Sequence, residues 1–164
     1  MPRPNPFDSA ASTEKRLAMS AARLSSVQAL YQMEMSGQGL NEVRQQFEDF
    51  RIGMEIDGEQ FREADLGLFR KILDDAQTHQ AEIDQLTDRK LADNWPLGRI
   101  DATLRALFRA AGAELYESPR TPPKVIISEY VDLARAFFPT SKEPGFVNAV
   151  LDAMAREVRP EGFK

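Results

Sequence analysis

The chain has 164 residues, of which 42% are hydrophobic and 29% are charged, a balance typical of one globular domain with a buried core. It contains no cysteine and a single histidine, His79, which excludes thiolate zinc sites, disulfide frameworks, cysteine nucleophiles and histidine clusters. No stretch approaches the roughly 18 apolar residues of a membrane span, and the N-terminal segment lacks the apolar core of a signal peptide. We therefore expect a cytoplasmic protein without redox or zinc chemistry.

The net charge of −5 is unevenly distributed. Residues 1–44 carry 5 basic and 4 acidic side chains, residues 45–93 carry 6 and 13, and residues 94–164 carry 10 and 9. The acidity is thus concentrated in the middle third, and the outer thirds can still offer a local basic surface. A dedicated non-specific nucleic-acid binder would be more basic, so we expect any RNA binding to be local and assisted by a partner. Two interpretations of the acidic third stay open: it repels RNA, or it attracts a basic partner.

The first half of the chain predicts three helices. Three prolines in the first six residues indicate a disordered leader up to about Ser12. Apolar residues then recur every three or four positions from Leu17 to Met35, the spacing of one helix face, and glycines 37 and 39 are plausible C-terminal caps. The predicted elements are helices over 13–36, 41–51 and 59–79, with a turn over 53–58.

The second half predicts further helices. A short helix carries Ile83 and Leu86, and residues 97–117 place Arg105 and Arg109 opposite an apolar face. The wide apolar arc of the helix over 124–138 predicts that this helix is central, and its helical spacing argues against a strand at 125–127. The other predicted elements are loops over 93–96, 118–123 and 139–145 and a last helix over 146–158. The fold class is all-α, a compact bundle of six or seven helices in one domain over residues 13–160.

A search for catalytic groups finds little. His79 lies in a polar segment, with no second ligand at helical spacing, so a solvated helix end explains it better than a general base or a metal ligand. The carboxylate pairs 74/75 and 82/84 diverge on a helix. Phosphate-binding and nucleophile-elbow glycine motifs are absent. We therefore expect no catalytic residue, no metal site and no cofactor.

Basic and aromatic side chains are the better candidates for binding. Arg16 and Arg23 are seven residues apart, so they lie on the same side of the first helix, although ordinary solubilising charges are the alternative. Phe146 follows Gly145 at a predicted helix start, where free backbone N–H groups and an exposed ring suit a phosphate and a base. A core phenylalanine is the alternative there.

Four segments together resemble the NusB family of bacterial transcription antitermination factors. In chain order they are RLSSVQALY at 23–31, LRALFRAAGAEL at 104–115, PKVIISEYVDLAR at 123–135 and FVNAVLD at 146–152. Each alone is an amphipathic helix of low specificity, but their order and spacing hold from about Arg16 to Arg159. The resemblance implies two packed helical sub-bundles and a non-enzymatic role.

The resemblance also implies partners and contact residues. NusB-family proteins pair with the small-subunit ribosomal protein NusE, bind the boxA element of nascent ribosomal RNA, and join the RNA polymerase elongation complex with other Nus factors. Arginine and lysine suit phosphates, glutamine and asparagine suit base edges, and phenylalanine suits an unpaired base. The implied RNA-binding residues are Arg16, Arg23, Gln28, Arg109, Lys124, Phe146 and Asn148.

The sequence departs from the family pattern at several positions. The first helix lacks a dense arginine run, which favours dependence on the partner, and Leu104, Ser128 and Ala149 replace residues common in the family. One alternative is a structural interaction module, such as a homodimer, with weak or lost RNA binding. Another is an enzyme, since the same domain occurs fused to ribosomal-RNA cytosine methyltransferases. We expect no such activity, because the chain stops at Lys164 and has no cysteine.

Overall fold

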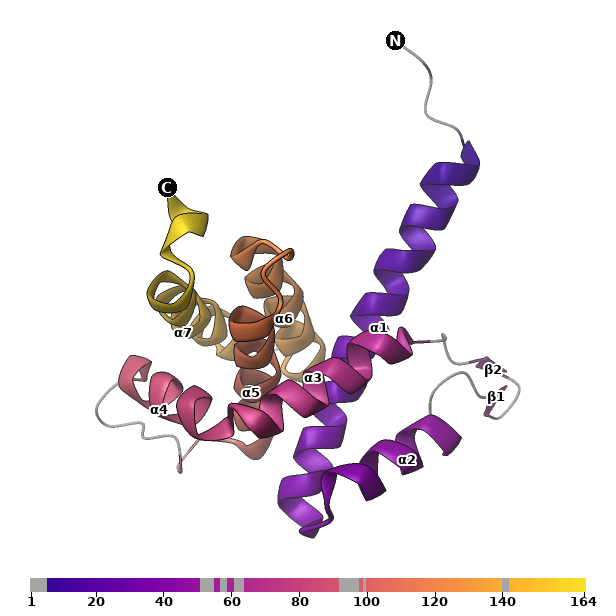
Figure 1. The fold of residues 1–164 in the computed structure, drawn as a ribbon, viewed down its shortest axis with the longest axis horizontal. Coiled ribbons are helices and arrows are strands. Elements are labelled where there is room, and N and C mark those ends of the chain that lie inside the picture. The colour runs from indigo at the N-terminus through magenta and orange to yellow at the C-terminus, as the bar shows by residue number, and fades with distance from the viewer. Residues whose placement is uncertain are drawn as a thin grey trace.

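The protein is described by a computed structural model that covers residues 6–50, 55–56, 59–60, 64–91, 98, 100–139 and 142–164. Seven α-helices and a C-terminal 3-10 turn make up most of this described part (Figure 1). They are α1 (Pro6–Ser36), α2 (Leu40–Phe50), α3 (Leu66–Thr78), α4 (Gln80–Lys90), α5 (Ala102–Glu117), α6 (Pro123–Phe137), α7 (Glu143–Val158) and η2 (Pro160–Phe163). The predicted all-α class is confirmed. Within the described residues, no helix has both the length and the apolar character needed to cross a membrane.

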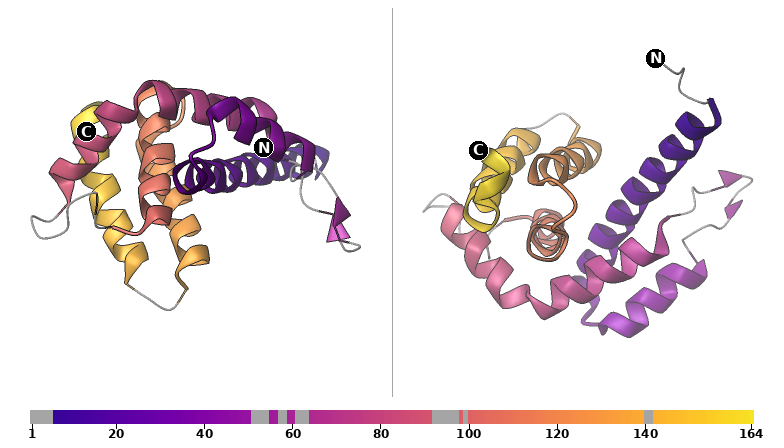
Figure 2. Two further views of the ribbon diagram at one scale, coloured as in Figure 1. Left: turned by 90° about the horizontal axis from the view of Figure 1, so that it is seen from below. Right: turned by 45° about the horizontal axis from the view of Figure 1, so that its top comes forward.

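The first helix is longer than its sequence pattern indicates. It begins at Pro6, where the prediction placed a disordered leader as far as Ser12; residues 1–5 lie outside the described part. Proline suits a first helical turn because its φ is already helical and its missing N–H has no partner to lose there. The N-terminal part of α1 projects beyond the other helices (Figures 1 and 2). At the other end, Gly37 takes a φ of +74° and its N–H bonds to Met33 O, as predicted for a cap.

The segment between α2 and α3 contains two very short strands instead of the start of a helix. Strands β1 (Glu55–Ile56) and β2 (Glu59–Gln60) pair antiparallel, with Glu55 opposite Gln60. The predicted helix start at residue 59 is therefore wrong. Helix α3 starts at Leu66, where the Asp65 side chain accepts a hydrogen bond from the Leu68 N–H at 3.0 Å. The core residue expected at position 61 and the loop expected at 93–96 lie outside the described residues.

Two sub-bundles share helix α5. Helices α1, α2 and α3 pack on one another, α4, α6 and α7 form the second group, and α5 contacts α1, α3, α4, α6 and α7 (Figure 2). The expected pair of sub-bundles is thus present. The prediction that the helix over 124–138 is central is wrong, because α5 occupies that place. Small residues on several sides allow this burial: Ala106, Ala110, Ala111, Gly112 and Ala113 are all buried.

Candidate nucleic-acid interface

The guanidinium of Arg23 is buried between helices. Its side chain is only 3% exposed, and it donates from Nε and Nη2 to the two carboxylate oxygens of Glu114 at 2.8 and 3.0 Å. The Tyr130 hydroxyl donates to the same carboxylate at 2.6 Å, and Glu129 lies 3.7 Å from Nη1 of the arginine. Burial disfavours the charged form of Arg23, but the hydrogen bond and charge of Glu114 outweigh it and raise the arginine pKa above its ordinary value.

In this fold the charge of Arg23 is therefore buried and paired with a protein carboxylate, so it is not exposed for an RNA contact. Arg16 lies on the same side of α1, as the seven-residue spacing predicts, yet Arg16 is exposed. The difference arises because Arg23 lies under α5 and α6, which supply its carboxylate partners, whereas the N-terminal part of α1 projects beyond the other helices (Figure 1). Spacing on one helix places both arginines correctly relative to each other but carries no information about which turns are covered.

Arg109 is held by carboxylates from two other helices. Its Nε and Nη2 donate to the Asp84 carboxylate at 3.0 and 2.9 Å, and Glu34 lies 3.8 Å from Nη1. Burial disfavours the charge, but Asp84 and Glu34 outweigh it and raise the pKa of Arg109. Arg105 pairs with Glu34 as well, at 2.6 Å. These arginines join α5 to α1 and α4, so an RNA phosphate at Arg109 would have to compete with protein carboxylates.

Phe146 does not lie at a helix start. Helix α7 begins at Glu143, and the Phe146 N–H donates to Lys142 O at 3.2 Å, so the expected free amide at this residue is absent. Its ring is half-buried and packs edge-on against Phe108, with the centroids 6.3 Å apart. The sequence placed this start three residues late because Pro144 and Gly145 read as loop residues, although proline and glycine are tolerated in a first turn. This half-buried environment is closer to the alternative interpretation, in which Phe146 is a core residue, than to an exposed ring at a helix start.

Lys124 and Asn148 are brought together, as their assignment to one surface requires. Both line a groove of about 350 Å³ between α6 and α7, and both are exposed. Neither side chain makes a hydrogen bond or an ion pair with another described residue. The groove carries three cations and one carboxylate, so its lining is net positive. Its full lining is Lys124, Ile127, Ser128, Val131, Arg135, Asn148, Asp152, Arg156 and Phe163. We call it the basic groove.

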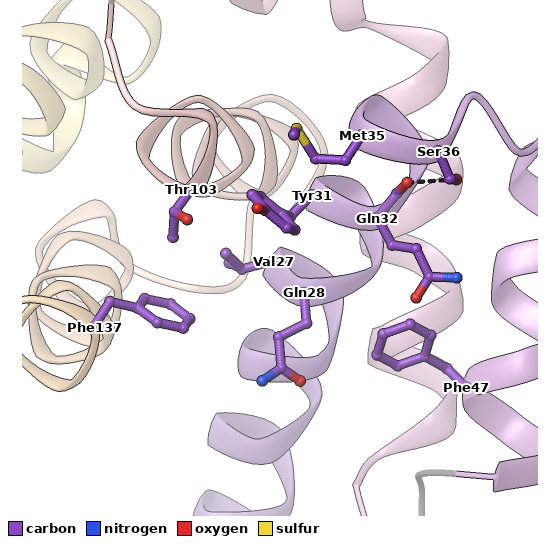
Figure 3. A pocket seen from close by; sticks show the side chains of 9 residues that line it. All are labelled: Val27, Gln28, Tyr31, Gln32, Met35, Ser36, Phe47, Thr103 and Phe137. Carbon is purple, nitrogen blue, oxygen red and sulfur yellow. Dashed lines mark hydrogen bonds between the residues drawn. The ribbon is translucent and has the colours of Figure 1, made fainter.

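Gln28 lines a second groove, of about 470 Å³, along α1 (Figure 3). Phe47 of α2 lies on one side of the α1 residues in the close-up view, and Thr103 of α5 and Phe137 of α6 lie on the other. None of the lining residues is charged: they are Val27, Gln28, Tyr31, Gln32, Met35, Ser36, Phe47, Thr103 and Phe137. We call it the neutral groove.

Sequence reasoning missed two apolar side chains that α1 exposes at the neutral groove. Tyr31 is 39% exposed and Met35 is 61% exposed, and they are one helical turn apart. Both belong to the regular apolar spacing that predicted a core face, so the pattern alone cannot mark them as surface residues. Arg156 and Phe163 of the basic groove were also missed, since they lie outside the recognised motifs.

The single histidine is paired with acidic side chains. His79, between α3 and α4, lies 2.7 Å from Glu117 Oε1 through Nε2 and 3.4 Å from Glu82 Oε1 through Nδ1, and it stacks on Tyr116. Desolvation lowers the histidine pKa, but the hydrogen bonds and charges of the two glutamates outweigh it and raise the pKa above its ordinary value. Among the described residues, no cluster of three or more histidine and acidic side chains is arranged to hold a metal ion.

The family model of the NusB family matches residues 20–156 of this chain. The chain belongs to the NusB family. Two curated relatives named "Transcription antitermination protein NusB" agree with that match. The protein of Mesorhizobium japonicum is 50% identical over 142 residues, which cover 87% of this chain and 91% of the relative. The protein of Rhodopseudomonas palustris strain TIE-1 is 50% identical over 143 residues, covering 87% and 82%. The expected function class, transcription antitermination, is thus confirmed at the level of the NusB family.

Solved NusB structures share the fold. The NusB of T. maritima superposes with a TM-score of 0.70 at 26% identity and covers 88% of this chain and 96% of its own. A chain from a crystal structure of the antitermination factors NusB and NusE in complex with dsRNA superposes with a TM-score of 0.68 at 24% identity, covering 85% and 97%. The helical architecture of this chain is therefore that of NusB.

Proposed function

We propose that this protein binds the boxA element of nascent ribosomal RNA together with the ribosomal protein NusE, and that the complex acts on elongating RNA polymerase with other Nus factors to suppress termination. The observation that carries the proposal is the presence of two grooves of different chemistry on one NusB fold. The basic groove suits an RNA backbone, and the neutral groove suits a protein.

The basic groove supports RNA binding because the side chains of its two motif residues, Lys124 and Asn148, have no competing partner among the described residues. Lys124 offers a charge to a phosphate, and Asn148 offers an amide to a base edge or a ribose hydroxyl. Two cations expected in the interface, Arg23 and Arg109, are committed to protein carboxylates. Fewer available cations mean weaker intrinsic RNA affinity, which favours a binding mode that depends on the partner.

The neutral groove supports protein binding. A tyrosine and a methionine exposed beside glutamine and serine side chains form an apolar surface with a polar rim, the composition typical of an interface centre. NusE is the proposed occupant, since a structural neighbour is a NusB crystallised with NusE and dsRNA. We further propose that the protein is not an enzyme, that it acts in the cytoplasm, and that residues 13–160 form a single domain.

An anisotropy titration of a labelled boxA-like RNA, with and without NusE, tests this function. We expect the partner to increase the affinity for the boxA-like RNA more than for a scrambled RNA of equal length. No gain from NusE, together with no preference over the scrambled RNA, would remove the proposal.

The burial of Arg23 and the pairing of Arg109 favour one other function, a structural homodimer with weak or lost RNA binding. Sedimentation at micromolar concentration separates the two. A stable dimer that does not bind RNA supports the alternative, and a monomer that binds RNA with NusE supports the antitermination factor.

A further inference from the structure

We propose that Arg156, held in place by the C-terminal 3-10 turn, is a phosphate-binding residue for the RNA backbone at one end of the basic groove. The inference rests on the proposed RNA-binding function and adds a contact that the family motifs do not contain. It assigns a role to the last residues of the chain, which those motifs leave without one.

The guanidinium of Arg156 is oriented by two neighbours. Its Nε donates to Asp152 Oδ2 at 2.8 Å, one helical turn away, and its central carbon lies 4.4 Å from the centroid of the Phe163 ring. A guanidinium this close to an aromatic face is attracted by the ring quadrupole. The terminal nitrogens Nη1 and Nη2 make no hydrogen bond with any described residue, and 59% of the side chain is exposed. The arginine is thus oriented in advance with two donor groups available.

The ring that supports Arg156 is itself fixed. Arg159 donates to three backbone carbonyls of the α5–α6 loop, those of Ser118, Pro119 and Thr121, at 3.0 to 3.2 Å. Gly162 lies so close to the start of α6 that a Cβ there would overlap Cγ of Pro123. These contacts fasten the turn Pro160–Phe163 to the loop and to α6. Phe163 therefore lies at a defined place beside the groove.

The position and charge of Arg156 suit an RNA strand. Helices α6 and α7 are consecutive and packed together, and the contact of Gly162 with Pro123 shows that the end of the chain lies at the start of α6, next to Lys124. Lys124 and Arg156 line the same groove, and the only carboxylate in its lining, Asp152, is already paired with Arg156. Along α6, Lys124 and Arg135 are separated by about 16 Å at 1.5 Å per residue, and Arg135 also donates from Nη1 to Asp132 at 2.8 Å. An extended, phosphate-bearing ligand matches cations spread over that length better than a single small anion does.

The test compares salt dependence in matched variants. Each phosphate contact contributes about 0.7 to the slope of log affinity against log salt for a single strand. We expect Arg156→Gln to reduce the magnitude of that slope by about 0.7 and to weaken binding roughly three- to tenfold, equally for boxA-like and scrambled RNA. Arg156→Lys should keep the slope but lose part of the affinity, because lysine has neither the planar fork nor the ring stacking of arginine.

The matched control is Arg70→Gln on α3, in the other sub-bundle. Arg70 is also exposed, and its Nε also donates to a carboxylate, Glu48 Oε1, at 2.6 Å. Thermal unfolding of each variant verifies that the fold is intact. The RNA titration is also repeated with inorganic phosphate replacing chloride at constant ionic strength, and we expect no specific competition.

The outcomes separate the two proposals. If the unmodified protein, with NusE present, binds no RNA, the proposed function and this inference both fail. If it binds RNA and Arg156→Gln behaves as Arg70→Gln does, the inference alone is overturned. A loss confined to boxA-like RNA would contradict a backbone contact, and strong competition by millimolar phosphate would assign the site to a free anion instead.

Discussion

Arg23 and Glu114 form a bidentate ion pair that joins α1 to α5 across 91 positions of sequence. Tyr130 adds α6 to the same carboxylate. A planar guanidinium fixes both the direction and the distance of its partner, so the pair specifies how the three helices cross. Helix α1 lines the neutral groove and α6 lines both grooves, so the buried network sets the positions of the two candidate binding surfaces relative to each other.

We predict that replacing Arg23 alone strongly destabilises the fold. Arg23→Met leaves the Glu114 carboxylate buried without its cation, which costs roughly 3–5 kcal/mol of unfolding free energy. The double variant Arg23→Met, Glu114→Met should lose less than the sum of the single variants, since it removes both charges. Urea unfolding measures each value, and Arg16→Met on the exposed part of α1 is the control. A loss for Arg23→Met as small as that of the control would contradict a structural role for the pair.

Hydrophobic spacing located the helices better than their ends. The interiors of all seven follow from apolar residues at three- and four-residue steps, because a helix buries one face wherever it packs. The ends depend on local capping and on which turns are covered. Helix α1 begins at Pro6 and α7 begins at Glu143, just before Pro144, where prolines predicted a leader and a loop. Asp65 caps α3 after a segment that a helical pattern had included.

The residues of the candidate site were also only partly predictable, because helical spacing does not report which turns other helices cover. Lys124 and Asn148 were placed correctly on a shared surface, because motif residues on consecutive helices are neighbours. Arg23 was not, because burial of a cation depends on Glu114, 91 positions away, and helical spacing cannot report that. Tyr31 was taken for a core residue because it continues the apolar spacing of α1, but it lies in the neutral groove and is 39% exposed.

We predict that Gly112→Ala changes stability with opposite signs in two backgrounds. A Cβ at Gly112 would lie 2.5 Å from Cγ2 of Ile83, so alanine overpacks the contact of α5 with α4 and costs about 1–3 kcal/mol. In an Ile83→Ala background that branch is gone, and the added methyl fills part of the cavity while improving helix propensity. Urea unfolding of the four proteins in this cycle gives the coupling. Equal effects in both backgrounds would rule out the close approach as the reason for the glycine.

We predict that Tyr31→Ala weakens binding of the protein partner and spares RNA. An exposed aromatic side chain in an interface centre is a common hot spot, and its truncation costs about 1–2 kcal/mol, or roughly five- to thirtyfold in affinity. Calorimetric titration with NusE measures the loss. Val125→Ala is a matched control, because Val125 is 44% exposed on α6 and lines neither groove. The neutral groove is excluded as the partner surface if the two variants bind NusE equally well.

His79 provides a pH-dependent contribution to stability that can be isolated because the chain has no other histidine. The carboxylates of Glu82 on α4 and Glu117 on α5 favour the protonated ring, while Lys71 also reaches the end of α5 through the Glu117 carbonyl. The folded pKa is therefore raised above the unfolded value of about 6.5. A raised pKa means that the folded state binds the proton more tightly than the unfolded state does. This stabilisation is therefore complete below the unfolded pKa and is lost as the pH rises through the folded pKa.

We predict that the stability difference between the unmodified protein and His79→Gln shrinks as the pH rises above the unfolded pKa of about 6.5 and through the raised folded pKa. Urea unfolding at several pH values measures that difference, and an NMR titration of the single imidazole gives its folded pKa directly. Glu117→Gln serves as the control, because it keeps the histidine while removing the carboxylate 2.7 Å from Nε2, and it should lower the imidazole pKa. An imidazole pKa at or below about 6.5 in the unmodified protein would mean that desolvation outweighs the two glutamates, and the sign of the pH dependence would then reverse.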